Sequence, residues 1–177
     1  MKKIFFSGLL LLFIAFVNAQ EKEEEKEFAE KKHSVALVIS HTQMNEGIEG
    51  GKKEWISLPS WGIDYNYELC EKWAVGLHND IIMESFIVEH NDGTEIERSS
   101  PFASTVVALY KPGKHFSFVL GAGGEFSKEE NLFLIKAGIE YGYRFHDDWE
   151  LIANITNDLK VDAYNSWAIG FGIARKF

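Results

Sequence analysis

The stretch LFLIKAGIEYGYRF at residues 132–145 decides the fold of this 177-residue chain. Its odd-numbered residues, from Phe133 to Phe145, are all apolar or aromatic. Its even-numbered residues become small or charged after Leu134, with Lys136 and Glu140 among them. An alternation with a period of two residues is the pattern of a β-strand that has one apolar and one polar face. The stretch therefore predicts a long strand of this kind.

The same alternation recurs along most of the chain and predicts seven further strands. The eight expected strands are residues 33–43, 54–68, 73–87, 101–111, 115–126, 132–145, 149–158 and 166–177. Tight connections at 69–72, 112–114 and 146–148 alternate with longer polar ones at 44–53, 88–100, 127–131 and 159–165. Short turns at one end and long loops at the other are typical of an up-and-down meander, and eight such strands close into a barrel.

The amino terminus has the parts of a secretory signal peptide. Two lysines precede an apolar run from Ile4 to Val17, and Ala19 is a small residue at the expected cleavage point. We expect residues 1–19 to be a signal peptide, 20–32 a charged flexible leader and 33–177 the barrel domain. Gln20, and not a cysteine, directly follows the cleavage point, so no lipid anchor is expected.

The apolar face is expected to point outward. Eight strands enclose a space just wide enough for side chains, and the many Phe, Tyr and Trp residues of the apolar face would overfill it. The other face is rich in glycine and alanine and fits inside. In a transmembrane barrel the apolar face meets lipid, and closure pairs every backbone group. The fold class predicted is therefore all-β, an eight-stranded antiparallel up-and-down transmembrane β-barrel; a soluble secreted barrel with an apolar pocket is the alternative.

The carboxyl terminus resembles the terminal signature of bacterial outer-membrane barrels, in which a final aromatic residue follows alternating apolar ones. Ile169, Phe171, Ile173 and Phe177 carry this resemblance. It implies a small eight-stranded outer-membrane protein of a Gram-negative bacterium over residues 32–177, inserted by the barrel-assembly machinery. Arg175 departs from the pattern, since it places a charge on the outward face, where it could reach the headgroups.

This topology puts both termini and the three tight turns in the periplasm and the four longer loops outside the cell. Aromatic residues gather at the turn end and predict a periplasmic girdle. Its expected members are Tyr65, Tyr67, Trp73, Phe116, Tyr141, Tyr143 and Trp149. Cys70, the single cysteine, falls in a periplasmic turn and is expected to be a free thiol or to form an intermolecular bridge.

The inward face carries polar residues that are expected to form one network in the lumen. They are Asp64, Asn66, Glu68, His78, Asp80, Glu84, Lys136, Glu140, Arg144 and Glu150. Because a buried charge without a partner is costly, Lys136 and Arg144 are expected to pair with carboxylates and plug the barrel. The alternative is a narrow channel for ions or small solutes, with surplus carboxylates at Asp64, Asp80 and Glu140.

Other function classes find little support. A formal charge of −9, from 18 basic and 27 acidic residues, excludes the basic surface that nucleic acids require. The six histidines are scattered and no calcium-loop spacing occurs, so no metal and no cofactor is expected. A lipid-modifying enzyme would need a Ser-His-acid group; His41 and Ser85 lie near strand ends, but no nucleophile motif accompanies them. No catalytic residue is assigned.

The longer loops are acidic, with Glu46 and Glu49 in the first and Glu89, Asp92, Glu95 and Glu97 in the second. They could bind cations that bridge to lipopolysaccharide, or present a contact surface. We therefore expect a monomeric, non-enzymatic outer-membrane protein with a structural or surface-interaction role. Its expected partners are outer-membrane lipids, lipopolysaccharide and, during insertion, the assembly machinery.

Overall fold

The computed structural model describes residues 31–49, 52–89 and 93–177. The expected signal peptide, most of the expected leader and Asp92 lie outside the described residues, as do the side chains of Glu46 and Glu49. Within the described ranges, no helix has the length and apolar character needed to cross a bilayer.

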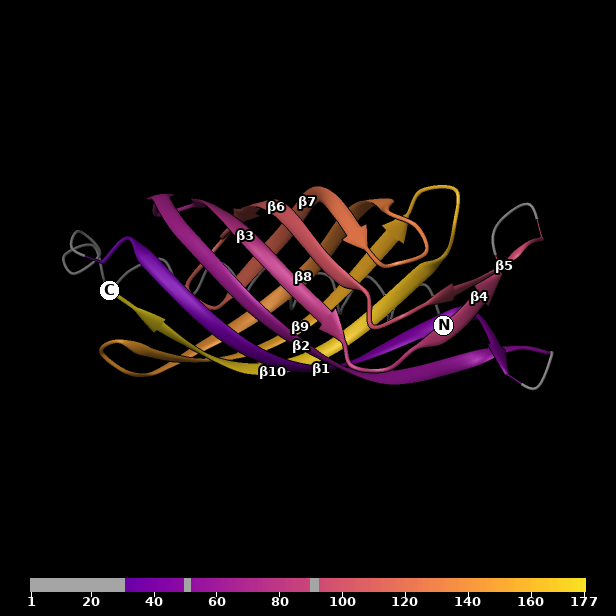
Figure 1. Ribbon diagram of the computed structural model, residues 1–177. Helices are drawn as coiled ribbons and strands as arrows, with labels where there is room; N and C mark the ends of the chain where they lie inside the picture. The colour runs from indigo at the N-terminus through magenta and orange to yellow at the C-terminus, as the bar shows by residue number, and fades with distance from the viewer. Residues whose placement is uncertain (1–30, 50–51, 90–92) are drawn as a thin grey trace, which may run out of the picture.

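Ten antiparallel strands make up the described chain (Figure 1). They are β1 (His33–Glu49), β2 (Lys52–Cys70), β3 (Trp73–Ile82), β4 (Phe86–Glu89), β5 (Glu95–Arg98), β6 (Phe102–Tyr110), β7 (Phe116–Phe126), β8 (Leu132–His146), β9 (Trp149–Lys160) and β10 (Asn165–Lys176). Eight of them pair in the order β1, β2, β3, β6, β7, β8, β9, β10, and pairing of β10 with β1 closes the barrel. The eight-stranded antiparallel barrel predicted from the alternation is confirmed.

The expectation for the third strand was wrong in its length. The alternation continues to Ile87, but β3 ends at Ile82 and the chain bends at residues 83–85. It then forms the β4–β5 hairpin, in which Val88 pairs with Gly47 of β1. Phe86 and Val88 are buried, as are Ala74, His78 and Ile82 of β3, so even-numbered residues are again buried after the bend, although Glu84 within it is exposed.

Strands β1 and β2 are longer than a membrane crossing requires. They have 17 and 19 residues, whereas a crossing strand needs about 9–11. Their outer ends form a sheet with β4 and β5 in the order β2, β1, β4, β5. Figure 1 shows this sheet projecting beyond the loop end of the barrel, on the side opposite the carboxyl terminus.

The apolar face points outward around the whole barrel. Leu37, Trp61, Val106, Leu120 and Phe171 are exposed, although each is large and apolar. The polar and small residues point inward, where Gly123 shows why small residues are needed: a Cβ there would lie 2.0 Å from the backbone oxygen of Ser104. An exterior of this kind is costly in water and favourable in lipid. The predicted direction of the two faces is therefore confirmed.

Candidate functional site

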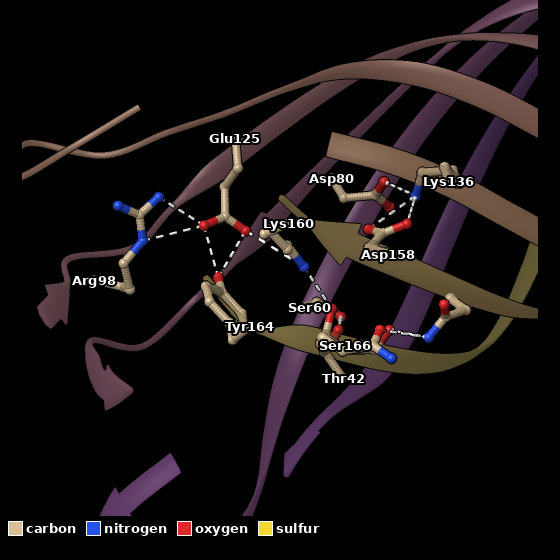
Figure 2. Close-up of polar contacts among 12 residues, drawn as sticks. Thr42, Ser60, Asp80, Arg98, Glu125, Lys136, Asp158, Lys160, Tyr164 and Ser166 are labelled. Atoms are coloured by element: carbon tan, nitrogen blue, oxygen red, sulfur yellow. Dashed lines mark hydrogen bonds and ion pairs between the residues drawn. The ribbon is translucent and has the colours of Figure 1, made fainter. Parts of the chain in front are cut away.

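The middle of the lumen is organised around Lys136 of β8. Its Nζ donates to Asp80 Oδ2 of β3 at 2.8 Å and lies 3.1 Å from Asp158 Oδ1 of β9 (Figure 2). Lys136 is 2% exposed. One cation thus joins three strands across the barrel, and each carboxylate offsets part of the desolvation cost of the ammonium group.

Next to this cluster lie further buried polar groups. His78 Nε2 and Asn66 Oδ1 are 3.0 Å apart, and His78 Nδ1 is 3.8 Å from Asp64 Oδ1. Asp64 is 4% exposed, yet its Oδ1 has no hydrogen-bond partner among the described residues. Glu140 faces the same interior from β8, where the charges of Lys111 and Lys176 act on it, as the charge of Lys136 acts on Asp64. The lumen thus holds two further carboxylates beside the Lys136 cluster.

A second ionic group closes the turn end of the lumen. Glu68 forms an ion pair with Lys111 and lies 3.7 Å from Lys176 Nζ, which is also 3.9 Å from Glu150. Arg144 does not join this group: it is exposed at the end of β8, opposite Glu150 in the register. The expectation that Arg144 is a buried partner of the network is corrected, because its side chain is exposed near the turn end of β8.

The outer mouth of the lumen is closed by a cluster that we call the outer latch, formed by Arg98, Glu125, Lys160, Tyr164 and Ser166. Glu125 Oε1 accepts hydrogen bonds from Arg98 Nη2 at 2.6 Å and Nε at 3.1 Å, and from the Tyr164 hydroxyl at 2.6 Å. Lys160 Nζ lies 3.5 Å from Glu125 Oε2 and donates to Ser166 Oγ at 2.5 Å. These side chains, shown in Figure 2, come from β5, β7, β9, the loop after β9 and β10.

The outer latch is continuous with an apolar layer beneath the hairpin. The buried residues of this layer are Met44, Leu58, Ile82, Phe86, Val88, Leu132, Ala163 and Tyr164. Phe86 meets the Tyr164 ring edge to face at 5.9 Å between centroids. Burial and the Glu125 carboxylate raise the pKa of the Tyr164 hydroxyl well above its ordinary value, so this hydroxyl remains a donor. Buried residues of the hairpin and the hydrogen-bonded outer latch thereby pack together at the outer mouth.

The outer latch was missed by the sequence analysis. Glu125 is an odd-numbered residue of its strand, like the inward residues Gly121 and Gly123, so the alternation of residues could have predicted that its side chain points into the lumen. Lys160 lies just beyond the expected end of its strand, and Arg98 and Tyr164 lie in segments without periodicity. Asp158 lies at an even-numbered position of its strand, as the inward residue Glu150 does, so the same alternation could have predicted its place in the lumen.

Glu84 does not occupy the lumen position assigned to it. It lies exposed in the bend between β3 and β4, because β3 ends at Ile82. The other inward residues of the expected network, Asp64, Asn66, Glu68, His78, Asp80, Lys136, Glu140 and Glu150, lie on strands that line the lumen.

The aromatic residues assigned to the turn end lie there on the barrel strands. Trp73 packs against Tyr110, Tyr141 contacts Phe116 and His115, and Trp149 lies 5.5 Å beneath the Arg175 guanidinium. His33 binds the Tyr65 hydroxyl at 2.7 Å and packs against Tyr67 and Phe177. Tyr143 is also exposed, as are Ile169, Phe171 and Ile173 along the outward face of β10.

The residues considered for catalysis are not brought together. His41 lies on the outward face of β1 and Ser85 in the bend after β3, with β2 between the two strands. Within the described chain, no three acidic, histidine or cysteine side chains are grouped closely enough to hold a metal ion. Cys70 is exposed at the turn end, where a thiol can be reached from the aqueous phase.

The loop residues at the outer end are tied to each other. The Glu129 carboxylate accepts hydrogen bonds from Ser127 and from the Ser99 hydroxyl, the latter at 2.8 Å. These hydrogen bonds lower the pKa of Glu129 to about 2. Arg98 Nη1 donates to the backbone oxygen of Glu130 at 2.6 Å. The loop after β7 and the β4–β5 hairpin therefore form one ordered acidic surface.

Comparisons with known proteins show the fold. No protein-family model matches the chain, and no curated protein matches it. Among solved structures, Ail, the attachment invasion locus protein of Yersinia pestis, in complex with the heparin analogue sucrose octasulfate, has a TM-score of 0.56 at 17% identity, covering 84% of this chain and 99% of that one. Another structure of Ail has a TM-score of 0.53 at 15% identity over the same shares. Neisserial surface protein A has a TM-score of 0.49 at 12% identity, covering 82% and 97%.

Proposed function

We propose that this small eight-stranded barrel of the outer-membrane type is a non-enzymatic outer-membrane protein that presents its projecting sheet as a contact surface. The observation that carries the proposal is the combination of a capped lumen with ordered strands beyond the membrane. Arg98 and Glu125 close the outer mouth, while β1, β2, β4 and β5 continue outward as one sheet. A barrel that only spans the membrane needs no such extension.

The chemistry of this surface constrains its partner. Exposed Glu95, Glu97 and Glu129 make it acidic, and Trp55 is 66% exposed on β2. Ail was solved with a sulfated heparin analogue, but an acidic surface repels such a polyanion. The expected partner is therefore neutral or basic, with the exposed Trp55 ring as the main apolar contact.

A narrow channel is the second candidate. It is supported by the lumen carboxylates Asp64 and Glu140, which would favour the passage of positive ions. It is disfavoured by the outer latch and the apolar layer, whose buried side chains pack together at the outer mouth.

Three measurements test the proposal. Fractionation with heat-modifiable gel migration is expected to place a folded, compact protein in the outer membrane; recovery from the soluble fraction would overturn it. Planar-bilayer recordings are expected to show no steady conductance, and a cation-selective current would favour the channel.

The contact role is tested by cell binding. Cells that display a variant in which residues 45–53 are replaced by a two-residue Asn-Gly turn are expected to bind cationic or neutral surfaces more weakly than cells with the wild-type protein. A matched variant with Glu71 changed to alanine, in the exposed turn at the opposite end of the barrel, is the control. Equal binding by the shortened and wild-type proteins would refute the role of the sheet.

Partners during biogenesis are also part of the proposal. The outward residues Ile169, Phe171 and Ile173 and the terminal Phe177 form an accessible apolar row on β10, the strand that closes the barrel. We expect the assembly machinery to recognise this row. The barrel is expected to act as a monomer, since closure leaves no unpaired edge within the membrane.

A further inference from the structure

The outward face of the barrel is not equally apolar on all sides. Tyr65 on β2 and Tyr141 on β8 both mark the turn end. Eight residues further toward the loops, β8 carries Phe133, whereas β2 carries Ser57. Eight residues are about 26 Å of strand and, at a tilt of about 45°, about 19 Å of height. Both positions therefore fall within the apolar band of about 25 Å that such barrels present to lipid.

Ser57 belongs to a group of outward polar side chains on neighbouring strands. It pairs in register with Gln43 of β1, and Gln43 pairs with Trp167 of β10. His41 lies on the same face, two residues before Gln43. Figure 1 shows β10, β1 and β2 side by side along this part of the barrel. We call His41, Gln43 and Ser57 the polar notch, since they interrupt the outer part of the apolar face.

The polar notch has unused hydrogen-bonding capacity. All three side chains are exposed, and within the described chain none of them makes a side-chain hydrogen bond. The outward pair Asn79 and Ser104, on β3 and β6, behaves differently. Ser104 Oγ donates to Asn79 Oδ1 at 2.8 Å, and Asn79 donates to the backbone oxygen of Ile63. Polar groups at membrane depth need a partner, and the polar notch must find it outside the protein.

Tryptophans frame the polar notch. Trp61 is 41% exposed, Trp167 is 48% exposed and Trp55, two residues beyond Ser57, is 66% exposed. The chain has five tryptophans, and the other two, Trp73 and Trp149, both lie at the turn end. Every tryptophan of the outer half therefore borders this one sector. Indole rings offer flat faces to C–H groups and an N–H donor to polar ones.

The chemistry of the notch selects among headgroups. An imidazole, a carboxamide and a hydroxyl supply donors and acceptors, while lysine and arginine, which bind phosphate most strongly, are absent from the three positions. Neutral hydrogen-bonding groups framed by aromatic rings suit sugar hydroxyls and the C–H face of a sugar ring. We propose that the polar notch on β1 and β2 holds the saccharide headgroup of an outer-leaflet glycolipid. The proposal rests on the outer-membrane placement given above and adds a lipid partner and its site.

Binding of defined lipids to the purified full-length protein in detergent, measured by native mass spectrometry, tests the site. The probes are an acylated glucosamine disaccharide without phosphate groups and a phosphatidylethanolamine with matched acyl chains. The glycolipid is expected to bind more tightly. The double variant Gln43→Leu/Ser57→Ala is expected to weaken glycolipid binding about tenfold, the effect of losing two neutral hydrogen bonds, and to leave phospholipid binding unchanged.

The matched control is Asn79→Leu/Ser104→Ala, which removes the internally bonded polar pair on the next strands, β3 and β6, and should leave glycolipid binding unchanged. Heat-modifiable migration verifies that each variant is folded. Equal affinity for the two lipids, or equal loss in the two double variants, overturns the proposal. So does a wild-type dimer that Gln43→Leu dissociates, since the notch would then be a protein interface.

The outcome also separates this inference from the proposed function. If the protein fractionates with the outer membrane but shows no preference for the glycolipid, only the site is refuted. If it is recovered as a soluble protein, the membrane role fails as well.

Discussion

Replacing Arg98 with methionine is expected to destabilise the barrel by about 3 kcal/mol, because removing one partner of a buried ion pair leaves the other charge uncompensated. Glu125 would remain 2% exposed with two contacts left: the Tyr164 hydroxyl, at 2.6 and 2.8 Å from its two oxygens, and Lys160 at 3.5 Å. These contacts keep the cost at the lower end of the range of about 3–5 kcal/mol for such changes.

Glu125→Gln is expected to cost more, about 4–5 kcal/mol, because it leaves two buried cations, Arg98 and Lys160, without a carboxylate. The double variant Arg98→Met/Glu125→Gln should be less destabilised than the sum of the single variants, by a coupling energy of about 2 kcal/mol.

The assay is urea unfolding in detergent micelles, with the unboiled compact gel band as the folded fraction. Lys128→Ala, an exposed change in the adjoining loop, is the control and should leave the unfolding midpoint in place. A cost below about 1 kcal/mol for Arg98→Met, or strict additivity in the double variant, would refute the view that the outer latch is a coupled, desolvated unit.

Lys136→Met should destabilise the barrel by about 3–5 kcal/mol in the same assay, because it leaves two aspartates facing each other in the lumen; an unchanged midpoint would contradict the assigned pairing. Gly123→Ala should greatly reduce the yield of folded barrel, measured as the compact band, because the added Cβ would overlap the Ser104 backbone oxygen; normal yield would show that the close approach of the strands is wrong. Glu129 has a folded pKa of about 2, below its ordinary 4.5, so its contribution to loop order is complete above pH 4.5 and is lost as the pH falls toward 2; a loop hydrogen-exchange rate that does not rise over this interval would exclude the effect. Cys70 should react with a membrane-impermeant maleimide only after the outer membrane is permeabilised; labelling of intact cells would invert the proposed topology.

The alternation of residues was sufficient to predict the barrel because the period of two follows directly from strand geometry. Residues 132–145 were expected to be a strand, and β8 runs from Leu132 to His146. Pairing partners across the lumen were not accessible in the same way. Asp80 and Lys136 are separated by 56 residues, and their contact depends on barrel shear and radius as well as on parity.

The bend after Ile82 shows a second limit of periodicity. Phe86 and Val88 are even-numbered and buried, like the inward residues of β3. The alternation therefore could not reveal that the chain turns after Ile82 to pair with β1. The outer latch depends on this turn. Arg98 reaches Glu125 only because the hairpin crosses the mouth of the barrel, and long loops have no repeat from which such a path can be inferred.

The amino-acid sequence alone determined the number of barrel strands, the two faces and the outward direction of the apolar one, because each follows from local geometry and from the volume that eight strands can enclose. Only the tertiary structure decided which charges meet, that the hairpin caps the lumen, and that polar side chains of β1 and β2 lie beside each other on the lipid-facing surface. These features arise from register, shear and loop path, which bring together residues far apart in the chain.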